Sequence, residues 1–224
     1  MSNVFNSSIG RKLVMSLAGL FLISFLVVHL GINILLVIFE SREPFNIAAH
    51  FMGTNPVIKV FEIVLFGGFF LHIIYGVILF IQNSIARGSI RYKISNHSQT
   101  SFFSKYMIHS AAIITIFLVI HLMDFYIAAK FLGEAPEIMI NGELHHDLGL
   151  LVVERFKIGW VVAFYCLSMV LLAFHLHHGF QSAFQTLGIN HKRYSPTIHA
   201  IGVIYSIIVP LGFMLIPLYF YFIK

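Results

Sequence analysis

Five long runs of apolar residues, separated by short polar connections, dominate the chain. The runs cover residues 13–39, 57–85, 106–129, 158–187 and 198–223. Each is at least as long as the stretch of about 20 mostly apolar residues that a helix needs to cross a bilayer. Their only Lys, Arg, Asp or Glu residues are Lys59, Glu62 and Asp124, all near the end of a run. The pattern predicts an all-α integral membrane protein, with five transmembrane helices in a single domain over residues 1–224.

The connections between the runs carry their own signals. Residues 40–56 contain the turn formers Pro44, Gly53 and Pro56, and Ser195 followed by Pro196 predicts the start of the fifth helix. The connection 131–157 is the longest, and its stretch 148–156 predicts a short interfacial helix. His145, His146 and Asp147 of this connection are interpreted as solvated residues rather than a metal site, because adjacent histidines in an acidic loop are usually exposed.

The distribution of charge predicts the orientation. The amino terminus and the connections 84–105 and 188–197 share one side, and they contain no acidic residue. Their basic residues are Arg11, Lys12, Arg87, Arg91, Lys93, Lys105, Lys192 and Arg193. Positive charge marks the cytoplasmic side, so the amino terminus is expected inside and the carboxyl terminus outside. The net charge of +5 therefore reflects topology, and no nucleic-acid partner is expected.

The composition restricts the chemistry that the chain can perform. With 58% apolar and 10% charged residues and one cysteine, Cys166, it can form neither an intrachain disulfide nor a cysteine-held iron–sulfur cluster. It has neither a Walker loop nor a dinucleotide-binding glycine motif. Any redox chemistry must therefore use a cofactor held by side chains other than cysteine.

Histidines stand deep inside four of the five runs. His29, His72, His121 and His175 each lie 15 to 17 residues from the nearest basic residue of the inside connections, or roughly 22–26 Å along a helix. Ionisable residues at such depth are costly and face the bundle interior. One histidine on each of four helices provides two pairs of imidazoles, which is what two bis-histidine haems require.

The residues alone leave two questions about these histidines open. Depth from the outer side pairs His29 with His121 and His72 with His175, although the difference between His29 and His72 is only two residues. In the fourth run, His177 and His178 compete with His175 as ligand. The alternative to ligation is that each histidine is structural, linking helices through hydrogen bonds.

Glycines accompany two of the histidines. Gly76 follows His72 by four residues and Gly179 follows His175 by four, so each glycine shares a helix face with its histidine. Together with Gly19, they offer room for a flat porphyrin. Close helix packing without a cofactor is the competing explanation.

Three segments resemble the dihaem cytochrome b membrane anchor of succinate dehydrogenase and fumarate reductase, in its single-subunit, five-helix, menaquinone-linked form. They are S-L-A-G-L-F-L-I-S-F-L-V-V-H from Ser16, H-I-I-Y-G from His72, and H-L-H-H-G-F-Q-S-A-F-Q-T-L-G from His175. The resemblance implies two b-type haems with the pairs proposed above, His175 rather than His178 as ligand, and contact of Ser16 with a haem propionate. Lys192 and Arg193 are the nearest basic residues to the one that the family has near the end of its fourth helix.

The resemblance also implies partners and a location. Succinate chemistry would belong to a flavoprotein subunit with FAD and to an iron–sulfur subunit, both docked on the cytoplasmic side of a bacterial cytoplasmic membrane. This chain would itself be non-catalytic for succinate. Those subunits would dock on the basic connection with Arg87, Arg91, Lys93 and Lys105. Several copies of the whole complex could assemble into a higher oligomer.

Menaquinone would react near the outer haem and needs a nearby proton donor, for which Glu62 and Asp124 are the candidates. The chain departs from one fumarate-reducing relative at Ala173, where that protein has a glutamate assigned to proton transfer, and at Met15, where it has a glutamine. Two other functions fit the histidines. One is the cytochrome b subunit of another respiratory dehydrogenase, and the other is a proton-coupled transporter that uses buried histidines as relays.

Overall fold

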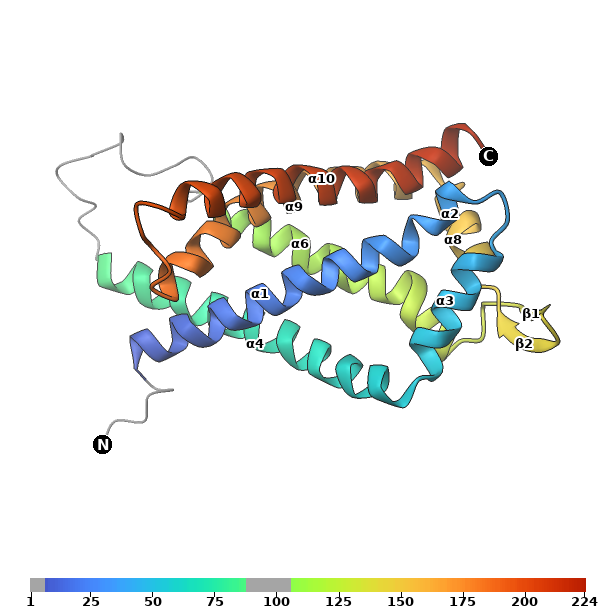
Figure 1. The fold of residues 1–224 in the computed structure, drawn as a ribbon, viewed down its shortest axis with the longest axis horizontal. Coiled ribbons are helices and arrows are strands. Elements are labelled where there is room, and N and C mark those ends of the chain that lie inside the picture. Colours follow the sequence, from blue (N-terminus) through green and yellow to red (C-terminus); the bar gives the residue numbers. More distant parts are fainter. Residues whose placement is uncertain (1–6, 88–105) are drawn as a thin grey trace.

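The computed structural model describes residues 7–87 and 106–224, and Figure 1 shows them as a bundle of long helices. Five of these helices are long and apolar enough to cross a membrane. They span Ile9–Ile38, Pro56–Ala86, Met107–Lys130, Gly159–Thr186 and Ser195–Phe222. The prediction of an all-α, multi-pass membrane protein is thereby confirmed, with span limits that differ from the predicted ones by no more than four residues.

The spans are built from helices with small interruptions. α1 (Ser8–Asn33) continues as α2 (Leu35–Ile38), while α4 (Pro56–Arg87), α9 (Gly159–Thr186) and α10 (Ser195–Phe222) are each one helix. The third span consists of α6 (Met107–His121), the π-helical segment η2 (Leu122–Ile127) and α7 (Ala128–Lys130). π-helical turns are rare and occur frequently at functional sites, and this one begins immediately after His121.

The starts of two spans have a local cause. α1 begins before the predicted residue 13 because the Ser7 hydroxyl accepts a hydrogen bond from the Gly10 N–H at 3.0 Å, which caps the helix. α10 begins at the predicted Ser195, with Pro196 in its first turn. Proline suits this position because its missing N–H is not needed there.

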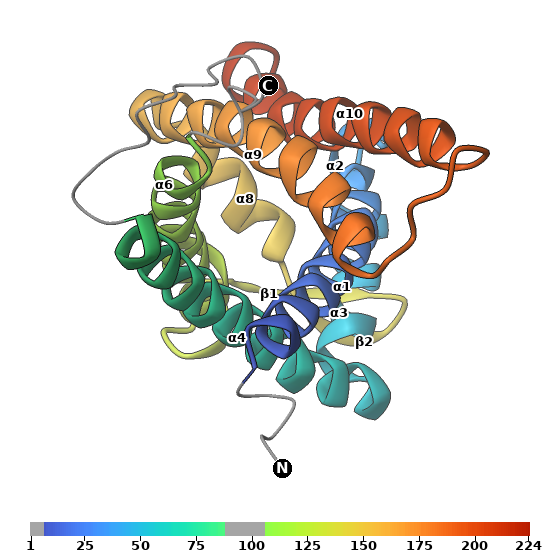
Figure 2. The ribbon, with the colours of Figure 1, turned by 90° about the vertical axis from the view of Figure 1, so that its left-hand side faces the viewer.

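One end of the bundle carries a cap made of α3 (Glu43–Thr54), β1 (Glu137–Ile140), β2 (Glu143–His146) and α8 (Leu148–Phe156). Figure 1 shows these elements together at the end where the chain terminates, and Figure 2 shows α8 crossing behind the ring of long helices. α8 matches the predicted interfacial helix. α3 replaces the predicted turns of residues 40–56, because Pro44 falls in the first turn of a helix, where proline is tolerated.

The strands of the cap form a two-stranded antiparallel hairpin in which Ile140 pairs with Glu143 and Glu137 with His146. Asn141 and Gly142 form its turn, with φ angles of +53° and +83°. Asn-Gly is a favoured pair for such a turn because both residues tolerate positive φ. The hairpin brings His145 onto its buried face and leaves His146 exposed.

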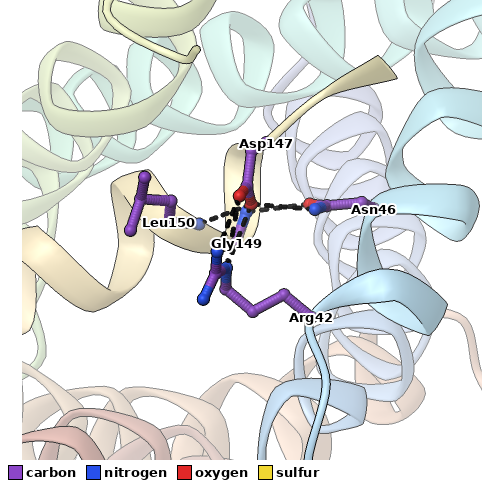
Figure 3. A network of polar contacts seen from close by, with 5 residues as sticks. All are labelled: Arg42, Asn46, Asp147, Gly149 and Leu150. Atoms are coloured by element: carbon purple, nitrogen blue, oxygen red, sulfur yellow. Dashed lines mark hydrogen bonds and ion pairs between the residues drawn. The ribbon is translucent and has the colours of Figure 1, made fainter. Parts of the chain in front are cut away.

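Polar contacts join α3 to α8, as Figure 3 shows. Asp147 caps α8 by accepting a hydrogen bond from the Leu150 N–H at 2.9 Å, and it also accepts one from the Arg42 Nη2 at 2.8 Å and one from Asn46 at 2.8 Å. Asn46, which is fully buried, accepts a bond from the Gly149 N–H at 2.9 Å. Burial works to raise the pKa of Asp147, but these bonds outweigh it and hold the pKa below its usual value.

Apolar packing is concentrated at the cap end. A cluster of buried residues joins α2, α3, α8, α9 and α10 there, and it includes Leu36, Phe45, Phe156, Val161, Tyr165 and Phe220. In the most hydrophobic stretch of α9 and of α10, 33% of the residues are buried, against 6% in each of the other three spans. Protein side chains therefore cover α9 and α10 more fully than they cover the other three spans.

Candidate functional site

The structure brings the four deep histidines together as two facing pairs. The rings of His29 on α1 and His121 at the end of α6 have centroids 5.8 Å apart. The rings of His72 on α4 and His175 on α9 have centroids 6.1 Å apart. These are the partners that depth along the helices predicted, and each pair joins two different helices.

The separation within each pair fits a metal held between two imidazoles. A metal–imidazole bond is about 2.0–2.1 Å long, so two rings on opposite sides of one metal ion have centroids about 6 Å apart. The observed 5.8 and 6.1 Å agree with this value. Within the described part of the chain, no three His, Cys, Asp or Glu side chains form a group that could hold a metal ion.

The hydrogen bonding of the histidines bears on the structural alternative. Nδ1 of His72, His121 and His175 is buried and has no hydrogen-bond partner. Leaving a buried polar atom unpaired costs about 1–3 kcal/mol, so these three Nδ1 atoms link no helices, although the His72 ring also lies within hydrogen-bonding reach of the Met15 backbone on α1. Only His29 has a polar side chain near Nδ1, the Asn33 amide at 3.4 Å, and that amide donates to the His29 carbonyl at 2.8 Å.

The fourth span contains three histidines, and its structure separates them. His175 is the one that faces His72. The ring of His177 lies beside His199 of α10, with centroids 6.3 Å apart. The geometry thus favours His175 over His177 as the partner of His72, in agreement with the helical periodicity of about 100° per residue.

The glycines near the second pair divide into two kinds. A Cβ on Gly19 would lie 3.3 Å from Cε1 of His72, so this glycine allows the imidazole to approach α1 closely. A Cβ on Gly76 would meet no protein atom nearer than 3.7 Å, and one on Gly179 none nearer than 3.9 Å. Contacts at those distances are ordinary, so close packing against protein atoms does not explain Gly76 and Gly179.

Aromatic rings enclose the first pair. Phe25 stacks on His29 at a centroid distance of 5.2 Å, and Phe117 stacks on His121 at 5.6 Å. Phe125 and Tyr165 also lie against His121, at 5.2 and 6.0 Å. The rings around this pair, which lies nearer the cap, are thus apolar except for the hydroxyl of Tyr165.

A polar cluster begins at that hydroxyl. Tyr165 donates a hydrogen bond to Asp124 at 2.9 Å, and Arg155 of α8 lies 3.5 Å from the other oxygen of the same carboxylate. Arg155 also lies 3.6 Å from Glu134, which is 45% exposed. Ionisable side chains therefore extend from the surface of the cap to the ring that touches His121. Sequence reasoning proposed Asp124 but missed Tyr165 and Arg155, which have no spacing signal.

Glu62, the other predicted proton donor, has a different environment. Its carboxylate accepts hydrogen bonds from the Tyr126 hydroxyl and from the Lys130 ammonium, the latter at 2.6 Å. The side chain of Lys130 is 50% exposed. One oxygen of the Glu62 carboxylate thus accepts both bonds, at the surface between α4 and α7. Among the described residues, neither bond leads to a histidine pair.

The predicted propionate contacts lie toward the opposite end of the bundle. Ser16 is buried, with 8% of its surface exposed, while Lys192 and Arg193 are exposed in the turn between α9 and α10. Arg91, Lys93 and Lys105 of the predicted docking connection lie outside the described residues. Sequence reasoning also missed Gln181 of α9, whose Nε2 is buried without a hydrogen-bond partner.

Comparison with known proteins adds no assignment to this site. No family model matches the chain, and no curated protein and no solved structure matches it either. What the site can do follows from its own geometry, which consists of two imidazole pairs at metal-binding separation and an acid–phenol–guanidinium cluster beside one of them.

Proposed function

We propose that this chain is the membrane-anchor cytochrome b subunit of a succinate:quinone oxidoreductase. In this role it passes electrons between an iron–sulfur subunit and menaquinone. The observation that carries the proposal is the arrangement of four imidazoles, one from each of four successive spans, in two facing pairs. Two b haems held by these pairs would supply one-electron transfer across the bundle.

The residues of the chain have distinct tasks under this proposal. His72 and His175 hold the group nearer the amino-terminal end of the bundle, and His29 and His121 hold the group nearer the cap. Gly76 and Gly179 leave room beside the first group, and Ser16 is the buried hydroxyl at its end of the bundle. Lys192 and Arg193 remain proposed propionate contacts from the connection at the same end.

Quinone reduction takes up two electrons and two protons, so it needs a proton donor beside the pair nearer the cap. Asp124 meets this need better than Glu62 does, because its hydrogen bond to Tyr165 connects it to the ring that contacts His121. Arg155 and Glu134 then connect Asp124 to the surface of the cap. We assign Asp124 and Tyr165 to proton delivery, with Arg155 as the positioning residue.

The resemblance to the succinate dehydrogenase anchor suggests the partners, and the charge of the chain suggests the side on which they dock. A flavoprotein subunit with FAD and an iron–sulfur subunit would dock at the end that carries Arg11, Lys12, Lys192 and Arg193, on the cytoplasmic side of a bacterial cytoplasmic membrane. Electrons from succinate would enter at that end and reach the quinone near the cap. The same arrangement works in reverse for fumarate reduction.

A haem count with a reduced-minus-oxidised spectrum of the purified chain tests the proposal. Two haems per chain are expected. His72→Ala and His175→Ala should each remove one haem, and His29→Ala and His121→Ala should each remove the other. His177→Ala is the matched control on α9 and should retain both haems. A ratio of haem to chain near zero in the unmodified protein would overturn the haem assignment and favour the proton-coupled transporter. Two haems without binding of an iron–sulfur partner would instead point to another respiratory dehydrogenase.

A further inference from the structure

The cap contains a histidine pair that the proposed electron path does not use. His50 on α3 and His145 on β2 have ring centroids 4.2 Å apart, with an angle of 48° between the ring planes. They are 95 residues apart in the chain and belong to different elements, so only the fold brings them together. His145 is 6% exposed and was expected to be solvated. Its burial is therefore a correction to the interpretation of residues 145–147.

The geometry of this pair differs from that of the two pairs in the bundle. With metal–nitrogen bonds of about 2.0–2.1 Å, each imidazole centroid lies about 3.1 Å from a bound metal. A centroid separation of 4.2 Å then corresponds to an angle of roughly 85° at the metal. Tetrahedral coordination requires a separation of about 5 Å, whereas square-planar and octahedral metals place neighbouring ligands at about 90°. The pair therefore suits Cu²⁺ or Ni²⁺ better than Zn²⁺.

The two ring nitrogens of His145 have different surroundings. Nδ1 is buried and has no hydrogen-bond partner, while Nε2 lies 4.0 Å from the Glu143 carboxylate. A metal-binding histidine commonly gives its second N–H to a carboxylate, which fixes the tautomer and leaves the other nitrogen free to bind. Glu143 on the same strand is at ion-pair distance but too far for a hydrogen bond, so it would have to move closer to take this role, and Nδ1 is the atom left for the metal.

The neighbouring polar groups Asp147 and His146 do not occupy the place of a metal beside Nδ1 of His145. Asp147 is engaged by Arg42, Asn46 and the Leu150 N–H. His146 is exposed, because successive side chains of a strand point to opposite faces. His50 is half-buried at the edge of the pair, so water can reach a metal there and complete its coordination.

We propose that His50 and His145 bind one divalent transition metal of tetragonal preference, Cu²⁺ or Ni²⁺, with Glu143 as a positioning residue. The metal joins α3 to the β1–β2 hairpin and so fastens the two parts of the cap. The site needs neither haem nor quinone, and it stands whether or not the proposed electron transfer is correct.

The test uses the full chain carrying a tag without histidine, stripped of metal with a chelator and titrated with Cu²⁺. The electron paramagnetic resonance spectrum should show one tetragonal Cu²⁺ bound by two nitrogens. Hydrogen exchange in α3 and the hairpin should slow on binding. Absence of a two-nitrogen signal from the unmodified chain overturns the proposal, whatever the variants do.

Variants identify the ligands among the thirteen histidines. His50→Gln and His145→Gln each remove a ligand and should weaken the binding of this Cu²⁺ by more than about 100-fold, while Glu143→Gln should weaken it less, because a carboxylate partner of a metal ligand is worth about 10–100-fold. His146→Gln is the matched control on the same strand and should bind as the unmodified chain does. Equal loss in the control, or no loss in either of the first two variants, refutes the assignment. Circular dichroism and the thermal unfolding midpoint of the metal-free chain establish that each variant is folded.

Discussion

The Tyr165 hydroxyl donates a hydrogen bond to the Asp124 carboxylate at 2.9 Å, and the Tyr165 ring lies against His121 at a centroid distance of 6.0 Å. One side chain of α9 thus connects a carboxylate to a proposed haem ligand. Asp124 lies in the π-helical segment that follows His121. Its carboxylate contacts Tyr165 of α9 and Arg155 of α8.

Replacement of Asp124 tests its role in proton delivery. Asp124→Asn should lower menaquinone reduction by the succinate-oxidising complex by at least about tenfold, because a positioned general acid contributes about 10²–10⁴ to a rate. The haem content should stay at two per chain, since Asp124 is not a ligand. Tyr165→Phe should show a smaller loss in the same direction. The measurement is quinone turnover, together with a haem spectrum of the same sample.

Glu62→Gln provides the comparison for that prediction. Glu62 is already bound by Tyr126 and Lys130 at the protein surface, and an exposed ion pair contributes only about 0–1 kcal/mol. Its loss should leave both quinone turnover and stability close to those of the unmodified chain. If Glu62→Gln abolishes turnover and Asp124→Asn does not, the proton donor has been assigned to the wrong carboxylate.

The glycines of α4 allow a test of clearance for the haem. Gly76→Leu should remove the haem held by His72 and His175, because the new side chain extends into the space that this glycine leaves open. Gly67→Leu is the control on the same helix, since a Cβ there also has no protein neighbour within 4 Å. Nine residues separate the two glycines, which puts them on opposite faces at about 100° per residue. Haem stoichiometry distinguishes them, and equal haem content in both variants contradicts the clearance role.

The amount of this structure that is predictable from sequence depends on the range of the interaction. Apolar runs and the spacing of His29, His72, His121 and His175 depend on local periodicity, so the spans and the pairing could be predicted. Asn141–Gly142 between alternating residues is also a local hairpin signal, yet the hairpin was not predicted. Residues 40–56, which include α3, were taken for turns because Pro44, Gly53 and Pro56 mark helix ends as well as loops.

Contacts between distant residues could not be predicted in this way. Tyr165 and Asp124 are 41 residues apart on different elements, and nothing in either neighbourhood identifies the other. The π-helical segment η2 has the composition of an ordinary apolar helix, so it has no sequence signature. The same holds for His50 and His145, which lie close together because α3 packs against β2.

The Asp147 network should make the cap sensitive to acid. Because the pKa of Asp147 is lower in the folded protein than its ordinary value of 3.8, its charged form contributes stability that is fully present above about pH 4–5 and is lost as the pH falls through the folded pKa. Asp147→Asn should weaken the cap at neutral pH by a few kcal/mol at most, since Arg42 would lose its buried partner. Hydrogen exchange of α3 and α8 measures the effect. Glu137→Gln, at an exposed position of β1, should not change that exchange.

The direction of insertion can be tested with the single cysteine of the chain. Cys166 lies within α9, so Cys166→Ser gives a cysteine-free background in which one new cysteine can be labelled. Met139→Cys, on the exposed side of the hairpin, should react with a membrane-impermeant maleimide in intact cells, because the basic residues gather at the other end and hold it in the cytoplasm. Thr197→Cys, at that other end, should react only after the cells are opened. The reverse labelling pattern would place the cap, the Asp124 cluster and the His50–His145 pair on the cytoplasmic side, and the proton for the quinone would then come from the cytoplasm.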